Sequence, residues 1–227
     1  KLLSCVAGQA MKLHALSITR WKHENESIKE PVHLCYSVDL SQLSFFQRGT
    51  VKEITALVLR TCVAKTNPGD YQRLEHEGNY IYIISRHNGL AGVCIADTEY
   101  PQRVAFSIIT KMLDDFTEAC KGKFSEEAAD NCMPFPPLEQ ALQKYQDPAE
   151  ADKITKIQKD LEETKQVLYN TIDAVLARGE KLDDLIEKSD SLSMQSKKFY
   201  KTAKKHNQCC VVAFFRVGKF KTKKKSV

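Results

Sequence analysis

Residues 154–206 read ITKIQKDLEETKQVLYNTIDAVLARGEKLDDLIEKSDSLSMQSKKFYKTAKKH, and this stretch decides what kind of molecule the chain forms. Steps of three and four residues, taken alternately from Ile154, trace one seam through seven heptads without a skip. Such a pattern predicts a helix of about 80 Å, at about 1.5 Å per residue, with one partner-facing edge. The small domain before it cannot cover so long a helix, so the helix needs partner helices. The seam positions other than its central one are Ile154, Ile157, Leu161, Thr164, Leu168, Thr171, Val175, Leu182, Leu185, Ser189, Leu192, Ser196, Phe199, Ala203 and His206.

The central seam position is Arg178, in phase between Val175 and Leu182. A buried guanidinium without acceptors is costly, so partner helices would have to supply them. A polar residue at a core position fixes register and partner choice at some cost in stability. The seam's Thr and Ser residues, with Gly179, predict a weak homodimer and favour mixed layers in a heteromeric bundle. Periodicity alone leaves open that Arg178 points outward from a loose coiled coil.

The first part of the chain has the pattern of a compact α+β domain. Alternating and apolar runs predict strands, and Asn- or Gly-containing turns separate the later ones. The order ββαβββαα indicates a five-stranded antiparallel sheet with helices on it, and residues 44–49 are predicted as a connector. Strands are expected at 11–20, 32–38, 71–76, 80–85 and 90–96, and helices at 50–65, from 101 through Phe116, and at 138–145.

Composition changes sharply along the chain. Net charge is +5, yet residues 1–190 hold 23 basic and 29 acidic groups, and eleven Lys/Arg with no acidic residue follow Asp190. A basic end on an acidic body suits an anionic surface, or it serves only as a solubilising tail. No apolar run near the carboxyl end approaches the about 20 residues of a membrane span. We expect a non-structural extension at 1–10, the α+β domain at 11–146, the coiled-coil segment at 149–207, and a Cys pair with a basic tail at 208–227.

The eight cysteines show neither CxxC nor zinc-like spacing. Cys35, Cys62 and Cys94 lie in apolar runs, where a thiol behaves as a small hydrophobe. We therefore expect a reducing compartment, no metal and no cofactor. Six scattered histidines pair with no nucleophile motif, and no phosphate-binding loop is present, so the chain is expected not to be an enzyme.

The segment Val175–Leu185, VLARGEKLDDL, resembles the centre of the synaptobrevin-type R-SNAREs. The preceding domain resembles a longin domain, with similar stretches at 45–48, 90–93 and 97–101. The resemblance implies an α+β longin (profilin-like) domain followed by a long α-helical SNARE coiled-coil segment. It further implies that Arg178 meets three glutamines from three Q-SNARE helices in a parallel four-helix bundle that draws two membranes together. An ATP-driven disassembly ATPase with its adaptor would then recycle the bundle. In this family the longin domain is thought to fold back on the SNARE helix, and the 50–65 helix is a candidate groove for it.

Cys209 and Cys210 resemble the lipidated pair of the prenylated longin R-SNAREs, with Cys210 prenylated and Cys209 carrying a second lipid. A prenylation box ends its chain, whereas here fourteen residues follow Cys210–Ala213. The departure implies either a misread or alternative final exon, which we favour, or a form that is not prenylated. In the second case the Phe residues of the basic 214–227 tail would supply weak membrane binding.

The resemblance implies vesicle fusion in ER, Golgi, endosomal or vacuolar transport. It places the chain in the cytosol and on the cytoplasmic face of Golgi, ER-derived vesicle and endosomal membranes. The alternative is a longin-domain trafficking adaptor whose coiled coil serves a non-fusion partner, which should tolerate Arg178→Leu. Nucleic-acid binding would rest on the basic tail alone, and none is expected.

Overall fold

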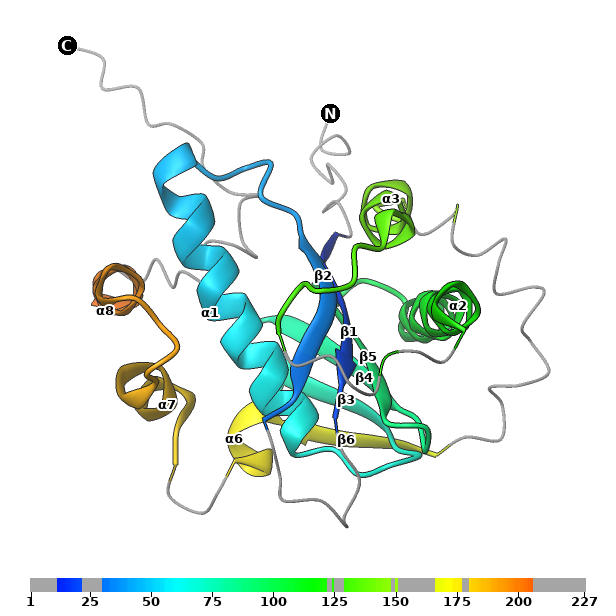
Figure 1. Ribbon diagram of the computed structural model, residues 1–227. Coiled ribbons are helices and arrows are strands. Elements are labelled where there is room, and N and C mark those ends of the chain that lie inside the picture. The colour runs from blue at the N-terminus through cyan, green and yellow to red at the C-terminus, as the bar shows by residue number, and fades with distance from the viewer. Residues whose placement is uncertain are drawn as a thin grey trace, which may run out of the picture.

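The computed structural model describes residues 12–21, 30–121, 124, 129–147, 150, 166–176 and 180–205. The described chain forms one mixed sheet with helices on both faces (Figure 1). The strands are β1 (Leu13–Arg20), β2 (Val32–Val38), β3 (Tyr71–His76), β4 (Asn79–Ser85), β5 (Leu90–Asp97) and β6 (Val167–Thr171), and the helices are α1 (Phe45–Ala64), α2 (Gln102–Cys120), α3 (Pro136–Lys144), α6 (Ile172–Val175), α7 (Leu182–Lys188) and α8 (Met194–Lys205).

The sheet order is β2-β1-β5-β4-β3-β6. The first five strands pair antiparallel, which confirms the predicted five-stranded sheet. The sixth strand, β6, joins the β3 edge in parallel and comes from the segment predicted as coiled coil. Helices α2 and α3 cover one face of the sheet, while α1 covers the other and carries α7 and α8 outside it (Figure 1). Each face therefore has its own apolar core.

Local chemistry fixes the β3–β4 hairpin and the packing of α2. Glu77 and Gly78 both take positive φ, +47° and +82°, as a two-residue turn of matching twist requires, so the predicted turn is confirmed. Gly92 lies on β5, where an added Cβ would stand 2.4 Å from Ile109 Cγ2 on α2. Glycine at 92 therefore sets how closely α2 approaches the sheet.

Helix α1 begins earlier than the sequence pattern predicted. The connector expected at 44–49 is its first turn, because Ser44 and Gln47 form a capping box. Their side chains bond through Ser44 Oγ and Gln47 Oε1 at 2.8 Å, and Gln47 Oε1 also accepts from the Ser44 backbone N–H at 3.1 Å. The prediction of a connector was wrong because it relied on the apolar stripe of the helix, which starts only at Val51. The Ser44–Gln47 capping box instead starts the helix at Phe45.

The segment after the first domain is helical in large part, as expected, but its described residues do not form one continuous helix. Residues 166–176 contain β6 and α6, and residues 180–205 contain α7 and α8. A single helix would present one stripe to the domain, and its Thr and Ser positions would bury little apolar surface there. Broken into short elements, the segment turns more apolar side chains onto α1 and the sheet edge.

Three cysteines predicted as small hydrophobes, Cys35, Cys62 and Cys94, are buried as expected. Burial raises the pKa of the Cys35 and Cys62 thiols to about 12, so both stay protonated and unreactive. Among the helices of the described residues, none is long and apolar enough to cross a membrane.

Candidate functional site

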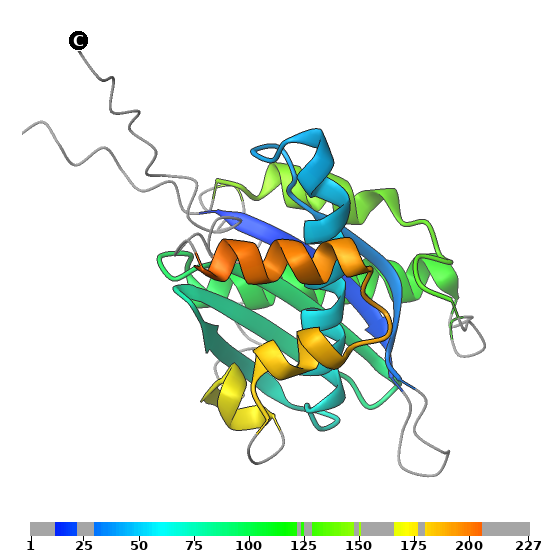
Figure 2. The same cartoon turned by 90° about the vertical axis from the view of Figure 1, so that its left-hand side faces the viewer.

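The candidate site is the segment predicted to bind partners. Its described residues, 166–176 and 180–205, fold back over α1 and the β3 edge (Figure 2). Helices α7 and α8 contact α1, the helix predicted as the groove. The predicted segment is thus present in a closed arrangement, hereafter the closed form. The contacts between this segment and the first domain determine which of the predicted seam residues are buried in the closed form.

Strand β6 is held on the sheet by an aromatic clamp around Arg73. The Arg73 guanidinium carbon lies 4.2 Å from the Tyr80 ring centroid on β4 and 4.5 Å from the Tyr169 ring centroid on β6. Gln102 joins the group, because its Oε1 accepts from Arg73 Nη1 and its Nε2 donates to Tyr169 Oη, both at 3.2 Å. A cation between two ring faces gives directional stabilisation beyond the backbone ladder. The clamp therefore holds β6, the first strand of the folded-back segment, on the edge of the sheet.

Helix α6 follows β6 through a side-chain cap. The Thr171 hydroxyl accepts from the Ala174 backbone N–H at 3.2 Å. The cap turns the chain so that Ile172 enters the α1 core with 1% of its surface exposed. Leu176 follows at 7%.

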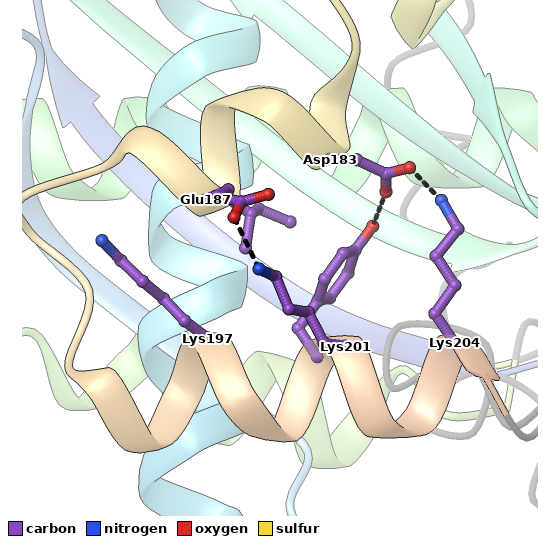
Figure 3. Close-up of a pocket in the computed structure, with 7 residues that line it drawn as sticks. Asp183, Glu187, Lys197, Lys201 and Lys204 are labelled. Carbon is purple, nitrogen blue, oxygen red and sulfur yellow. Dashed lines mark hydrogen bonds and ion pairs between the residues drawn. The ribbon is translucent and has the colours of Figure 1, made fainter.

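Helices α7 and α8 form a hairpin joined by charged pairs (Figure 3). The Lys201 ammonium lies 2.5 Å from Glu187 Oε1, and Tyr200 Oη donates to Asp183 Oδ1 at 2.6 Å. Lys204 pairs with the other oxygen of Asp183. Burial acts to raise the pKa of Asp183, but the bonds from Lys204 and Tyr200 outweigh it and lower that pKa. The hairpin thus keeps its carboxylates charged while Tyr200 stays buried.

Glu53 ties the start of α8 to α1. Its Oε2 accepts from the Ser196 hydroxyl at 2.7 Å and from the Ser193 backbone N–H at 3.1 Å. Burial acts to raise the pKa of Glu53, but these bonds together lower it, so the carboxylate stays charged. Ser196, a predicted seam residue with no exposed surface, is thereby bound to the chain's own domain.

Two cavities border the segment. One, of about 300 Å³, lies between α7 and α8 (Figure 3) and is lined by residues that include Ile186 and Tyr200. The other, of about 450 Å³, is polar and lies where the β3–β4 turn meets α6 and α7. His76 borders the second, and burial lowers the pKa of its imidazole, partly offset by Glu77, Asp173 and Asp183. His76 is therefore neutral in the closed form.

The structure places only part of the predicted seam. Leu168 and Thr171 are exposed, while Leu182, Leu192 and Ser196 are buried against the domain. The positions with intermediate burial are Val175, Leu185, Ser189, Phe199 and Ala203. The predicted residues that lie outside the described part of the chain are Ile154, Ile157, Leu161, Thr164, Arg178, His206, Cys209 and Cys210.

A second apolar set, which the heptad pattern did not predict, also packs in the closed form. Ile172, Leu176, Ile186 and Tyr200 are all buried, and each immediately follows a seam position. The sequence did contain a signal, since an apolar residue directly after a seam residue widens the stripe on one side. These four residues, together with the buried seam residues, hold the segment in the closed form.

Comparison with known proteins agrees with this architecture. Residues 40–142 match the Longin family model, described as a regulated-SNARE-like domain, and residues 153–217 match the Synaptobrevin family model. A domain of this fold carrying a synaptobrevin segment defines the class of R-type SNAREs with a longin domain.

Full-length relatives support the same class. The chain is 46% identical over 205 residues to the synaptobrevin homolog ykt6 of Schizosaccharomyces pombe, covering 89% of this chain and all of that protein. It is 45% identical over 202 residues to the VAMP-like protein YKT61 of Arabidopsis thaliana, with the same coverage. It is 44% identical over 180 residues to the synaptobrevin homolog YKT6 of Saccharomyces cerevisiae, covering 77% of this chain and 88% of that one. The chain belongs to the longin-type R-SNARE family, a non-enzymatic family of vesicle trafficking that works with partner SNAREs.

Proposed function

We propose that this chain contributes one helix, with Arg178 at its centre, to a parallel four-helix bundle with three Q-SNARE helices. Residues 149–207 would form that helix, and the seam residues from Ile154 to Ala203 would form its stacked layers. The amide oxygens of three glutamines would accept from the guanidinium without adding a second buried charge. The observation that carries the proposal is the unbroken seam with Arg178 at its centre, in a segment that matches the Synaptobrevin model.

The closed form supports a regulated version of this role. Leu182, Leu192 and Ser196 cannot serve a bundle while they are buried against the domain, so assembly requires release of α7 and α8. Strand β6 must also leave β3, because its residues belong to the same proposed helix. Leu168 and Thr171 have exposed side chains, although their backbone pairs with β3, and they precede the buried seam residues. Zippering from Ile154 toward the basic end would meet these residues first and displace α8 last. The order matches the direction in which a bundle must pull membranes together.

Membrane attachment at the carboxyl end belongs to the same proposal. Cys209 and Cys210 would carry covalent lipid beside the basic tail, since one lipid alone gives marginal anchoring and a second signal makes it stable. Intact-mass measurement of the chain purified from cells, with Cys209→Ser and Cys210→Ser chains as controls, tests this part. An unmodified mass would remove the lipid from the proposal and leave the basic tail as the anchor.

The proposed setting is fusion of vesicles in ER, Golgi, endosomal or vacuolar transport, at cytoplasmic membrane faces. A disassembly ATPase and its adaptor would return the chain to the closed form afterwards. No cofactor and no nucleic acid enter the proposal.

The test is reconstitution with the full chain. Tagged chain captures SNAREs from cell lysate, the captured Q-SNAREs are purified separately, and complexes are re-formed from all subsets. The proposal predicts a stable complex only when three Q-SNARE helices are present, with 1:1:1:1 stoichiometry of helices. Stable complexes with one or two partner helices would instead favour the adaptor alternative.

A further inference from the structure

The first turn of α1 displays two aromatic side chains to solvent. Phe45 and Phe46 are 80% and 82% exposed, and their rings meet edge to face with centroids 5.8 Å apart. The capping box between Ser44 and Gln47 fixes this turn, so the pair is held in place rather than carried on a loose connection. The first turns of α1 extend past the ends of β1 and β2 (Figure 1). The pair is therefore a rigid apolar projection of the first domain.

The folded-back segment leaves this projection uncovered. Both rings are exposed while α7 and α8 lie on α1. The hydrogen bonds from Ser193 and Ser196 reach α1 at Glu53, about two turns beyond Phe46. Neither ring belongs to the predicted seam. The projection is thus available whether the segment is closed or released, and its use is independent of bundle assembly.

Cationic side chains border the projection. Phe45, Arg48 and Lys52 lie on one line of α1, because they are three and four residues apart. Both cations are exposed, and within the described part of the chain neither forms an ion pair with a carboxylate. Arg48 Nε donates to Leu43 O at 3.2 Å, and Lys52 Nζ lies 5.0 Å from the Tyr36 ring centroid. The first turn of α1 contains no acidic residue. The border therefore favours carboxylates on whatever covers the rings.

Gly49 leaves the helix backbone open beside Phe46. It lies three residues after Phe46, on the same side of α1, and an added Cβ there would meet nothing within 4 Å. Glycine destabilises a helix interior relative to alanine, and no contact among the described residues requires it at this position. A partner can therefore approach the backbone closely next to the aromatic pair.

The properties of the pair favour a protein pocket as its occupant. Two Phe side chains bury about 300–500 Å² at about 150–250 Å² each, well below the about 800 Å² per partner of a stable symmetric contact. A bilayer fits poorly, because the apolar stripe of α1, with Ile54 and Val58, is buried in the domain core and cannot lie along a membrane. Phe also lacks the polar tip of the Trp and Tyr residues typical of membrane interfaces. Fixed aromatic side chains beside an arginine are instead typical of the few residues that dominate protein–protein binding.

We propose that Phe45, Phe46, Arg48 and Lys52 form a docking site for a protein with an apolar pocket bordered by carboxylates. The pocket receives both rings, and its carboxylates pair with the two cations. The wall of the pocket approaches α1 at Gly49. Because the site lies outside the contacts of α7 and α8, such a protein binds the chain without opening it.

Site-specific crosslinking in cells identifies what covers the site. The photoreactive residue p-benzoylphenylalanine replaces Phe46 in the full chain, and the same residue in place of Lys65, at the other end of α1, is the control. A crosslink to a protein is expected at position 46 and not at position 65. Crosslinks to phospholipid alone, or none beyond those of the control, would overturn the proposal.

The crosslinked protein is then purified and titrated against variants of the full chain by calorimetry. F45S/F46S should bind at least about tenfold more weakly, and F45L/F46L should also lose most of the binding, because a fitted pocket depends on ring shape whereas a bilayer would accept leucine. R48E should weaken binding about tenfold, most strongly at low salt, while the matched control K65E should not. G49Q should block the approach to α1. The melting temperature should not fall in any of these variants, because the changed positions are exposed.

Two results of the titration would overturn the proposal. One is unchanged affinity of F45S/F46S for the crosslinked protein, and the other is an equal loss for R48E and K65E. Assembly with Q-SNARE helices should be the same for all variants, so failure of the docking site is distinguishable from failure of the proposed bundle.

Discussion

Replacing Ile186 by alanine separates closure of the segment from bundle assembly. Ile186 lies on α7, is 1% exposed, and packs into the α1-side core, yet it is not one of the predicted seam residues. The change therefore weakens the closed form without deleting a proposed bundle layer. Few positions allow this separation, because Leu182 and Leu192 belong to both surfaces.

The magnitude follows from the buried volume that is lost. Ile→Ala in a packed core costs about 2–5 kcal/mol, and the lower end applies here because a short helix at the surface can relax into the space. About 2 kcal/mol corresponds to an about 30-fold larger population of the open segment, since about 1.4 kcal/mol is one factor of ten. Backbone amides of α7 and α8 should then exchange with deuterium about 30-fold faster.

Hydrogen exchange resolved by peptide is the assay, with Ile109→Ala as the matched control. Ile109 is also 1% exposed, but it lies on α2 in the core of the other face. Its truncation should destabilise the whole domain without selectively releasing α7 and α8. Equal protection of the α7–α8 peptides in Ile186→Ala and in the unmodified chain would refute the closed packing described here.

Three further outcomes are expected. Tyr169→Ala removes one ring from the Arg73 clamp and should raise exchange of the β6 amides several-fold while leaving α8 unchanged, which peptide-resolved exchange can check. Burial lowers the pKa of His76 in the closed form, so the closed form is favoured while the imidazole is neutral. That contribution to closure is lost as the pH falls below the ordinary histidine pKa. Hydrogen exchange of the α7–α8 amides should therefore speed up at low pH, and His76→Gln should reduce this pH dependence. Gly92→Ala places a Cβ against Ile109 and should lower the free energy of unfolding by about 1–3 kcal/mol in a denaturant titration, whereas an effect near zero would show that α2 can move away.

The sheet was predictable because its signals are local. Alternation along each strand and the Glu77-Gly78 turn specify a hairpin whatever the rest of the chain does. The start of α1 was missed because a cap of two polar side chains, Ser44 and Gln47, extended the helix beyond its apolar stripe. Propensity and stripe position alone do not reveal that extension.

The closed form was less predictable for a different reason. A heptad pattern describes the surface a helix offers to partners, and it takes no account of what the same residues do without them. Ile172, Leu176, Ile186 and Tyr200 each follow a seam position by one residue, and they are buried only because the segment packs on the core formed by α1 and the sheet. The clamp at Arg73 likewise joins β3, β4 and β6, which no short window of sequence places together.

Partner selection by Arg178 tests the central claim most directly. The chain and its Arg178→Leu variant are each offered a mixture of purified Q-SNAREs together with an R-SNARE competitor, and the assembled complexes are identified by native mass spectrometry. The account predicts that the unmodified chain takes only the position opposite three glutamine-bearing helices. The leucine variant should assemble with altered composition, because three amide oxygens would face an apolar side chain and lose their donor. Identical complexes from both chains would contradict the account.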